Sequence, residues 1–506
     1  MVATTSFTTL DWIIVFLYLG GTVTIGLLGK KYIGDVSHYL VAGRELGVYA
    51  GIATLAATEI GTVTFMYNAE FGYRYGFSAF AAALISGLVM IIIGRTGFVI
   101  GRFRQLRLMT VPEFFEVRYS RGLRLVTGLL VALGGILNMG VFLRIEGEFL
   151  TTVSGIDVKY LVAVMTAILV LELVYTVVGG MVSIVITDFL QYVLLSVATI
   201  LVSVNAVFHA GWGNIVHKVT TTLGEAGYSP MQNPRFGLTF IIWQILLWFA
   251  INTCWQTTAM RVFSTRNPET SQRVMTWTGF IYLGRGMLPM LWGIAALTLF
   301  GVGRVDQGVP VPVVHGHELA PIDAMPAMLA SILGPGVRGI VVAGMLAATM
   351  SVNSSYLLGW SAVISQDVIL PLRQIMGKPP LDTRRQIRIN RVANLFVGLF
   401  LMFWGLYYTP PGAVYLYLNI TGTIFLAGTF VGVVGGLYWK RASTAGGYSA
   451  MLMGAVGAIV PFFFLHWSEN ITGFFAFGLA AIGLVAGSLL ARRDAGSGPA
   501  QREVLS

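Results

Sequence analysis

The chain has 506 residues, of which 56% are hydrophobic and only 11% are charged, and its formal net charge is +10. An ordinary soluble domain has about 25% charged residues, so this composition excludes a soluble globular protein. Apolar runs recur from residue 12 to residue 490, and each has about the 20 residues that cross the hydrocarbon core of a bilayer. The sequence therefore predicts an all-α polytopic membrane protein that forms one membrane domain.

Thirteen apolar segments predict thirteen membrane-spanning helices. Their expected ranges are 12–29, 46–69, 78–101, 124–150, 158–178, 181–208, 238–262, 277–301, 337–370, 390–409, 412–438, 446–466 and 471–490. The first segment lacks the basic n-region and the small-residue cleavage site of a signal peptide, so we expect it to be kept as a helix.

Lysine and arginine are distributed unevenly between alternate loops. With the N-terminus outside, 23 of the 32 basic residues lie in inner loops and the C-terminal tail, and 6 lie in outer loops. Because basic loops resist translocation, this predicts an outside N-terminus and a cytoplasmic C-terminus in a plasma membrane of the bacterial inner-membrane type. The net positive charge is therefore explained by the membrane topology. It does not indicate a protein that binds nucleic acid.

Two predicted spans contain polar interruptions at about the same depth. The second span carries ATLAATEIGTVT at residues 53–64, with the carboxylate of Glu59 in its middle, and the seventh carries NTCWQTT at residues 252–258. Unwound backbone at membrane depth is tolerated only where it lines a cavity. Interruptions five spans apart indicate inverted five-helix repeats with a binding site between them, as in transporters. The alternative is a structural bundle with polar kinks.

Hydroxyl and carboxylate groups in two further spans predict a cation site. Ser351, Ser354 and Ser355 share one face of the ninth span, since residues three and four apart are neighbours on a helix. Asp188 is an intramembrane carboxylate in the sixth span. Oxygen ligands of this kind suit a hard cation such as sodium, whereas serines alone would indicate helix packing.

Four stretches resemble the sodium/solute symporter family, which includes sodium/glucose, proline and sialic acid transporters. AATMSVNSS at 347–355 is similar to the family's eighth core helix, and the region 175–191 to its fifth. AATEIG at 56–61 and WQTTAMR at 255–261 are similar to the first and sixth. The resemblance implies a LeuT-type 5+5 inverted repeat over residues 46–440, with an extra helix in 1–45, two in 441–490 and a cytoplasmic tail in 491–506.

The resemblance also implies sodium sites. The family's common site would use backbone carbonyls and one hydroxyl, from Ala57, Ile60, Ala348 and Ser351. Val352 stands where the family usually has serine or threonine, so this site lacks one oxygen ligand. A second site, known in some sialic acid transporters, would use Asp188, Ser351, Ser354 and Ser355.

Three ways of coupling to an ion remain open. Sodium binds the first site with water completing its coordination, or Asp188 and its serines carry the ion, or Glu59 takes up a proton because burial disfavours its charged form. We prefer sodium as the coupling ion, and we expect no other metal and no cofactor.

The solute is predicted from polar and aromatic residues near the two interruptions. Arg144 aligns approximately with an arginine that contacts the carboxylate in sialic acid transporters, although an internal pair with Glu148, one helical turn away, is the alternative. The predicted solute contacts are Glu59, Thr64, Tyr67, Arg144, Asn252, Trp255 and Gln256. They describe a small polar organic solute, such as a sugar, a carboxylate or an amino-acid-like compound.

These features predict a sodium-coupled symporter that imports such a solute by alternating access and functions as a monomer. The sequence has no HExxH, GxSxG or P-loop motif, so an enzyme or an ATP-driven pump is a poor interpretation. A proton-coupled symporter of the same fold is one alternative, and a transporter-like receptor or sensor is another. The short tail after Leu490 carries no output module for a sensor, and an ion channel would need a continuous polar stripe.

Overall fold

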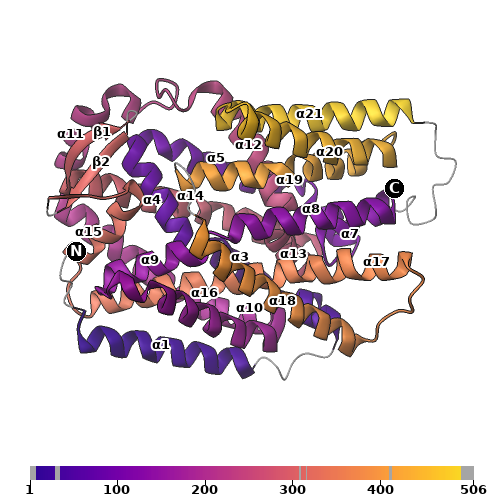
Figure 1. Ribbon diagram of the computed structural model, residues 1–506, viewed down its shortest axis with the longest axis horizontal. Coiled ribbons are helices and arrows are strands. Elements are labelled where there is room, and N and C mark those ends of the chain that lie inside the picture. The colour runs from indigo at the N-terminus through magenta and orange to yellow at the C-terminus, as the bar shows by residue number, and fades with distance from the viewer. Residues whose placement is uncertain (1–6, 29–34, 307–308, 315, 409–412, 492–506) are drawn as a thin grey trace.

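Long helices lie side by side along the longest axis of the molecule (Figure 1). The structure is a computed structural model that describes residues 7–28, 35–306, 309–314, 316–408 and 413–491. The first helices are α1 (Thr9–Leu28), α2 (Val36–Val41), α3 (Val48–Glu59), α4 (Thr62–Tyr75), α5 (Phe80–Thr96), α6 (Ile100–Gln105), α7 (Val111–Arg118), α8 (Arg121–Met139), α9 (Phe142–Ser154) and α10 (Leu161–Ala210).

The second part of the chain repeats this pattern of long helices and short connections. Its helices are α11 (Trp212–Leu223), α12 (Gly237–Cys254), α13 (Gln256–Ser264), α14 (Pro268–Leu299), α15 (Ala324–Ile332), α16 (Val337–Val363), α17 (Leu370–Ile375), α18 (Thr383–Tyr407), α19 (Val414–Tyr438), α20 (Thr444–Ile459) and α21 (Glu469–Leu490). Short 3-10 or π turns are η2 (Ala42–Arg44), η3 (Gly76–Ala79), η4 (Val158–Tyr160), η5 (Gly224–Gly227), η6 (Pro321–Asp323), η7 (Ile364–Ile369) and η8 (Val460–Phe464).

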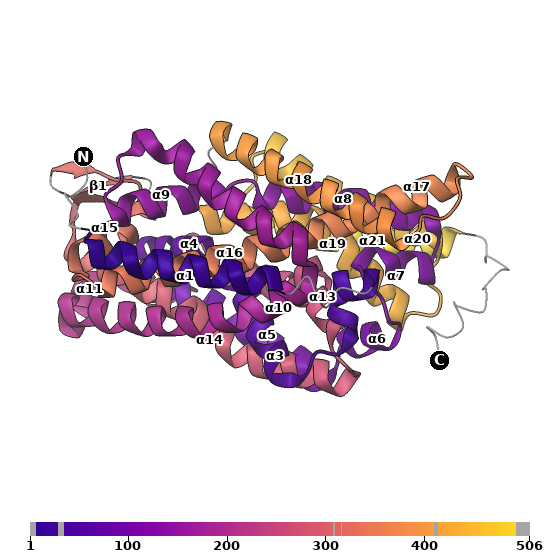
Figure 2. The same ribbon diagram turned by 90° about the horizontal axis from the view of Figure 1, so that it is seen from below.

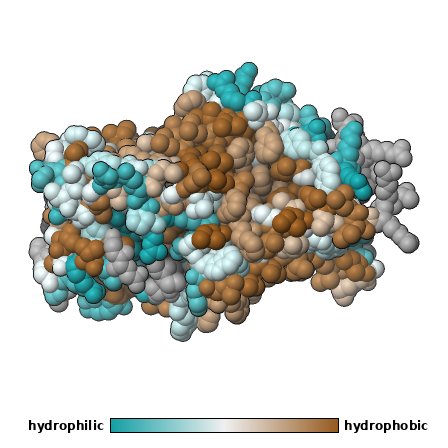
Figure 3. Space-filling model, turned by 90° about the horizontal axis from the view of Figure 1, so that it is seen from above, coloured by the Kyte–Doolittle hydropathy of each residue, from teal (hydrophilic) through white to brown (hydrophobic). Residues whose placement is uncertain are grey.

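Eleven helical segments of the described residues are long and apolar enough to cross a membrane. Large apolar side chains such as Leu17 and Phe208 stay exposed on their outer faces, as expected where lipid replaces water. Figure 3 shows hydrophobic residues covering the middle of one face, with hydrophilic residues gathered toward the ends. The predicted spans 158–178 and 181–208 join into the 50-residue α10, which bends sharply at Gly180 (φ 52°, ψ −153°). The count of thirteen spans stays a prediction.

The ends of the described chain lie on opposite sides of the molecule. α1 begins at one end of the long axis, and α21 finishes at the other end (Figure 1). An odd number of membrane crossings produces this arrangement. It agrees with the predicted placement of the termini on opposite sides, while the assignment of inside and outside still depends on the basic loops.

A small sheet departs from the all-α prediction. β1 (Gly301–Asp306), β2 (Val309–Val314) and β3 (His317–Glu318) form an antiparallel sheet in the order β1-β2-β3 between α14 and α15. β2 has the sequence VPVPVV, whose valines alternate with residues that cannot continue a helix. The sequence prediction treated this segment as an outer loop.

A partly buried ion network joins α7, α8 and η7 at the end of the molecule near α17 (Figure 2). Arg124 Nε lies 2.8 Å from Asp367 Oδ1, and Arg124 Nη1 lies 2.8 Å from Glu116 Oε2. Thr110 Oγ1 also donates to Asp367 Oδ1, at 2.8 Å. Arg121 contacts the same Glu116 from a more exposed position. The network ties the start of the third core helix to the end of the eighth.

Arg124→Gln is expected to destabilise the protein by about 3–5 kcal/mol, because it leaves the buried Asp367 carboxylate without its cation. Arg121→Gln is the matched control, since the Arg121 side chain is 51% exposed while that of Arg124 is 13% exposed. An exposed ion pair contributes about 0–1 kcal/mol. Denaturant-induced unfolding in detergent measures both changes, and equal losses of stability would contradict the expectation.

Candidate solute and cation sites

The first predicted interruption is a break between two half-helices. α3 ends at Glu59, Ile60 leaves the helical conformation (φ −113°, ψ 81°), Gly61 is extended, and α4 begins at Thr62. The Thr64 hydroxyl donates to the Glu59 backbone carbonyl at 3.3 Å and accepts from the Gly61 N–H at 3.3 Å. A side-chain hydroxyl thus satisfies backbone groups that the helix would otherwise have paired.

The second predicted interruption is also confirmed. α12 ends at Cys254, Trp255 is extended (φ −67°, ψ 124°), and α13 begins at Gln256. Both breaks therefore occur within the polar stretches that the sequence singled out. Helix ends in a membrane interior present free N–H and C=O groups, which can bind polar or charged ligands.

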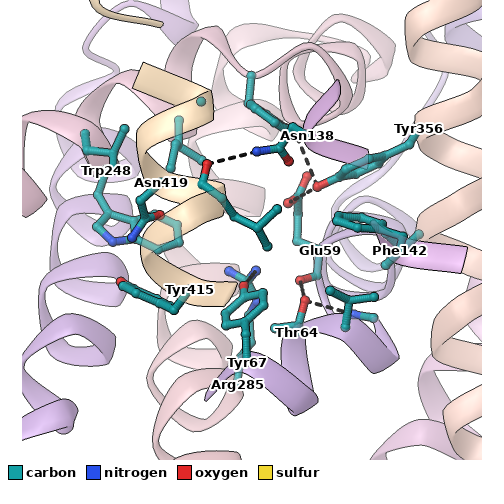
Figure 4. A pocket seen from close by; sticks show the side chains of 18 of the residues that line it. Glu59, Thr64, Tyr67, Asn138, Phe142, Trp248, Arg285, Tyr356, Tyr415 and Asn419 are labelled. Atoms are coloured by element: carbon teal, nitrogen blue, oxygen red, sulfur yellow. Dashed lines mark hydrogen bonds between the residues drawn. The ribbon is translucent and has the colours of Figure 1, made fainter. Parts of the chain in front are cut away.

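A pocket of about 720 Å³, including space open to solvent, lies between the two breaks (Figure 4). Residues of α3, α4, α8, α9, α12, α14, α16 and α19 surround it. Its lining residues are Glu59, Gly61, Val63, Thr64, Tyr67, Asn138, Phe142, Glu146, Leu247, Trp248, Ile251, Trp255, Arg285, Val352, Tyr356, Tyr415, Leu418, Asn419, Gly422 and Leu426. The mixture of aromatic walls with a few polar groups is typical of a site for a small organic molecule.

Glu59 brings a buried carboxylate to this pocket. Its Oε1 accepts from the hydroxyls of Thr257 at 2.8 Å and Thr258 at 3.0 Å, both at the start of α13. Among the residues that the structure describes, its Oε2 accepts only from the Tyr356 hydroxyl, at 3.4 Å. The carboxylate therefore joins both broken helices, and Oε2 retains capacity to accept a further hydrogen bond.

Arg285 brings a positive charge to the same pocket. Its guanidinium lies 4.5 Å from the centre of the Tyr282 ring and 5.8 Å from that of Trp248. Its one hydrogen bond within the described chain is a long one of 3.4 Å to the Tyr67 hydroxyl, and its Nε has no partner there. Figure 4 shows Arg285 and Tyr67 on one side of the pocket and Asn138 on the other. The guanidinium keeps free donors for an anionic group.

Four of the seven predicted solute contacts line the pocket, namely Glu59, Thr64, Tyr67 and Trp255. The other three do not line it. Arg144 Nε lies 2.8 Å from Glu148 Oε1, as helical i,i+4 spacing favours. The Gln256 side chain accepts from the Val111 N–H at 3.0 Å, at the start of α7, and Asn252 is buried outside the pocket lining.

Sequence reasoning missed several polar residues of the lining, namely Asn138, Glu146, Arg285, Tyr415 and Asn419. For Arg285 and Glu146 a signal existed, because they fall inside the predicted spans 277–301 and 124–150. An ionisable residue within a span indicates a functional site by default. The asparagines and Tyr415 carried no comparable signal, since single polar residues in spans also serve helix packing.

The second predicted cation site is a compact buried cluster around Asp188. The carboxylate accepts from Thr54 Oγ1 and Ser351 Oγ, each at 2.5 Å. Arg261 Nη2 lies 3.5 Å from Asp188 Oδ2 and donates to Ser355 Oγ at 2.5 Å. Asp188, Ser351 and Ser355 thus lie close together, as predicted, and the guanidinium of Arg261 also lies in this cluster.

The side chain of Ser354 makes a different contact from those of Ser351 and Ser355. Its hydroxyl donates to the Ser351 backbone carbonyl at 3.1 Å, so it bonds within its own helix. Ser354 is as buried as its neighbours. Its place among the predicted ligands stays a prediction.

The first predicted cation site lies where α16 crosses the break after α3. Ala57, Ile60, Ala348 and Ser351 are all buried. Gly61 and Val352 are in close contact, because a Cβ atom on Gly61 would lie 2.8 Å from Val352 Cγ2. The Val352 side chain therefore faces the break, where the family usually has a hydroxyl.

Comparisons with known proteins agree with this geometry. A model of the sodium:solute symporter family matches residues 39–454. The chain is 26% identical over 473 residues to a sodium/proline symporter of Staphylococcus aureus (strain Newman), covering 89% of this chain and 85% of that protein. It is 23% identical over 441 residues to a sodium/glucose cotransporter of Vibrio parahaemolyticus, covering 84% and 78%.

Solved structures show the same fold. The structure of a Na+-coupled sialic acid symporter in a substrate-bound outward-open state matches with a TM-score of 0.78 at 19% identity, over 96% of this chain and 98% of that one. A nucleobase-cation-symport-1 family transporter in a closed conformation matches with a TM-score of 0.57 at 14% identity, over 92% and 97%. These relatives are transporters rather than enzymes, and their fold is the predicted LeuT-type fold. The chain is therefore a multi-pass membrane protein of the sodium:solute symporter family, a sodium-coupled solute symporter.

Proposed function

We propose that this symporter imports a small carboxylate-bearing organic solute, which binds in the pocket between Glu59 and Arg285. The observation that supports it best is the guanidinium of Arg285, which has an unpartnered Nε in an aromatic pocket. A planar guanidinium fork suits a carboxylate through paired hydrogen bonds. Glu59 Oε2 then accepts from a hydroxyl or amine of the same solute. Amino-acid-like compounds and acidic sugars fit this description.

Sodium is proposed to bind at the first site, on the carbonyls of Ala57, Ile60 and Ala348 and the hydroxyl of Ser351. Ser351 Oγ donates its proton to Asp188 Oδ1 at 2.5 Å, so its lone pairs are left to coordinate a cation. Arg261 already neutralises Asp188 from 3.5 Å. Asp188 therefore acts by orienting Ser351, and water completes the coordination that Val352 leaves open.

Charge balance explains why sodium and a carboxylate bind together. Among the residues proposed to contact sodium and the solute, Glu59 and Asp188 supply two buried negative charges, and Arg261 and Arg285 supply two positive ones. A sodium ion would add one positive charge to this set of groups, and a buried charge without a counter-charge is costly. The carboxylate of the solute neutralises it.

The driving force is sufficient for useful accumulation. One cation moving down about 100 mV releases roughly 2.3 kcal/mol, and a tenfold gradient adds about 1.4 kcal/mol. Together they support several-hundred-fold accumulation per sodium ion of a solute without net charge, such as a zwitterionic amino-acid-like compound. A solute anion cancels the transported charge, so one sodium ion then supplies only the tenfold gradient term. We propose that the monomer carries out this cycle in a bacterial-type plasma membrane, with the N-terminus outside.

The test is uptake of a solute library into proteoliposomes under an imposed sodium gradient, and separately under a proton gradient. Arg285→Gln is expected to lower uptake of carboxylate solutes at least about tenfold, the loss of one charge-assisted hydrogen bond. Arg144→Gln is the matched control and should leave uptake nearly unchanged, because Arg144 pairs with Glu148. The reverse result would make Arg144 the solute contact, and uptake driven only by protons would overturn sodium coupling.

A further inference from the structure

Two buried glutamates near the pocket take no part in the proposed sodium or solute contacts. Glu146 on α9 and Glu172 on α10 are 2% and 1% exposed. The Asn353 amide on α16 bridges them, since its Nδ2 donates to Glu146 Oε2 at 2.8 Å and to Glu172 Oε1 at 3.0 Å. Two carboxylates from different helices thus share one amide group within the membrane.

The ion pairs of the described residues include neither glutamate. Charged groups on the helices packed against the pair are engaged with other partners. Four of these contacts are ion pairs, namely Arg144 with Glu148, Glu70 with Arg74, Asp188 with Arg261, and Asp367 with Arg124. Two carboxylates accept hydrogen bonds, Glu59 from the hydroxyls of Thr257 and Thr258, and Asp11 from the Gly336 and Gly339 amides. Three arginines contact other groups: Arg338 the Ala330 and Leu333 carbonyls, Arg285 the Tyr67 hydroxyl, and Arg391 the Tyr39 side chain. Asp323, at the start of α15, is a further acid on this side of the molecule. The two glutamates therefore face each other without a neutralising cation among these groups.

The hydrogen bonding around the pair is short of donors. Glu146 Oε1 and Asn353 Oδ1 are buried acceptors without a hydrogen-bond partner among the described residues. Buried acceptors are almost always satisfied in proteins. A proton on one carboxyl group would supply a missing donor.

We propose that Glu146, Glu172 and Asn353 form a proton-binding site, in which the two carboxyl groups share one proton. Neighbouring carboxylates in a site of low polarity cannot both stay ionised without a counter-charge. Glu146 also lines the solute pocket, so the proton exchanges with the water or solute there. The site depends on the proposed function only for the identity of that pocket, and it uses none of the residues proposed to bind sodium.

A cation is the competing occupant. Carboxylate and amide oxygens also suit sodium. The bridging amide nitrogen argues for a proton, because Asn353 places donors, not acceptors, between the two carboxyl groups. A sodium ion at this position would need those donors turned away.

Infrared spectroscopy of the reconstituted protein tests the proposal without a known solute. The wild type is expected to show the absorption of a protonated carboxyl group at pH about 7, well above the pKa of about 4.3 of a free glutamate. Glu172→Gln and Glu146→Gln should each remove that absorption, because a single remaining carboxylate accepts from Asn353 without a charged neighbour. Glu148→Gln is the matched control on the same helix, and its spectrum should equal that of the wild type.

Two results would overturn the proposal. One is a protonated carboxyl band that persists unchanged in both Glu146→Gln and Glu172→Gln. The other is loss of one bound sodium ion per molecule in these variants, measured with radioactive sodium alone, which would make the cluster a cation site. Unfolding midpoints in detergent check that each variant is folded, and the glutamine side chain preserves the volume. Sodium-driven uptake is measured separately, so failure of the transport proposal would leave the infrared result interpretable.

Discussion

Replacing Asp188 by alanine is expected to weaken the apparent sodium affinity of transport at least about tenfold. Ser351 Oγ would lose the acceptor that directs its proton away from the proposed sodium site. Hydrogen bonds to charged groups contribute about 1.5–3 kcal/mol, and about 1.4 kcal/mol corresponds to a tenfold change in affinity. The measurement is solute uptake into proteoliposomes as a function of external sodium concentration.

The same substitution also affects stability, and a second variant separates the two effects. Without Asp188, the buried guanidinium of Arg261 loses its ion pair, which costs about 3–5 kcal/mol. Asp188→Ala combined with Arg261→Met removes both charges, and replacing a buried ion pair by apolar groups is often neutral. The double variant should therefore recover stability but not sodium affinity.

Asp11→Asn is a control for the loss of a buried carboxylate. Asp11 accepts from the Gly336 and Gly339 amides at 2.8 Å and 2.7 Å, at the start of α16 and more than two turns before the proposed sodium ligand Ala348. Its substitution should lower stability and leave sodium dependence unchanged. If the Asp188→Ala, Arg261→Met double variant regained wild-type sodium affinity, Asp188 would be only the counter-ion of Arg261.

The groups proposed to bind the solute and sodium are connected through α13 and α16. On α16, Ser355 contacts Arg261 while the next residue, Tyr356, donates to Glu59. On α13, Thr257 and Thr258 hold Glu59, and Arg261 lies one turn further on. Movement of α13 relative to α16 would therefore disturb both sites. Because α13 and α16 contact both sites, binding of sodium is expected to favour binding of the solute, and the reverse.

Much of this arrangement could be predicted from the sequence because intramembrane polarity is rare. Glu59 and the threonines around it predicted an interruption within residues 53–64, and the helix breaks within that stretch, at Ile60 and Gly61. The polar stretch around Trp255 likewise predicted the second break. In lipid, backbone polar groups have no water to bind, so polar side chains in a span carry strong information about cavities.

The remaining features of the site and the fold depend on contacts between distant parts of the chain. The periodicity of the sequence does not show these contacts. Arg261 was recognised only as part of a family-like stretch, yet it contacts Asp188 and Ser355. Gln256 was expected in the pocket, but as the first residue of α13 it bonds the amide of Val111 on a distant helix. Which face of a short half-helix meets the cavity depends on how its neighbours pack. For the same reason, the sheet of β1, β2 and β3 was not predicted.

Replacing Val352 by threonine is expected to raise the apparent sodium affinity about tenfold or more. Val352 contacts Gly61 at the break, beside the carbonyls proposed to bind sodium. Threonine has nearly the same shape as valine and adds one hydroxyl oxygen, which would fill the coordination position that the sequence leaves empty. An added polar ligand to a charged group is worth about 1.5–3 kcal/mol, and sodium-dependent uptake curves measure the resulting shift in half-saturating concentration.

Val352→Ala distinguishes the hydroxyl from the change in packing. Alanine relieves the contact with Gly61 without supplying an oxygen, so it should not raise sodium affinity. Val352 also lines the solute pocket, and both variants can alter solute affinity through its shape. A tighter sodium dependence in Val352→Thr alone would support sodium at the break after α3. Unchanged sodium dependence in Val352→Thr, with solute uptake retained, would place the coupled ion elsewhere, and the Asp188 cluster would then be the position to test.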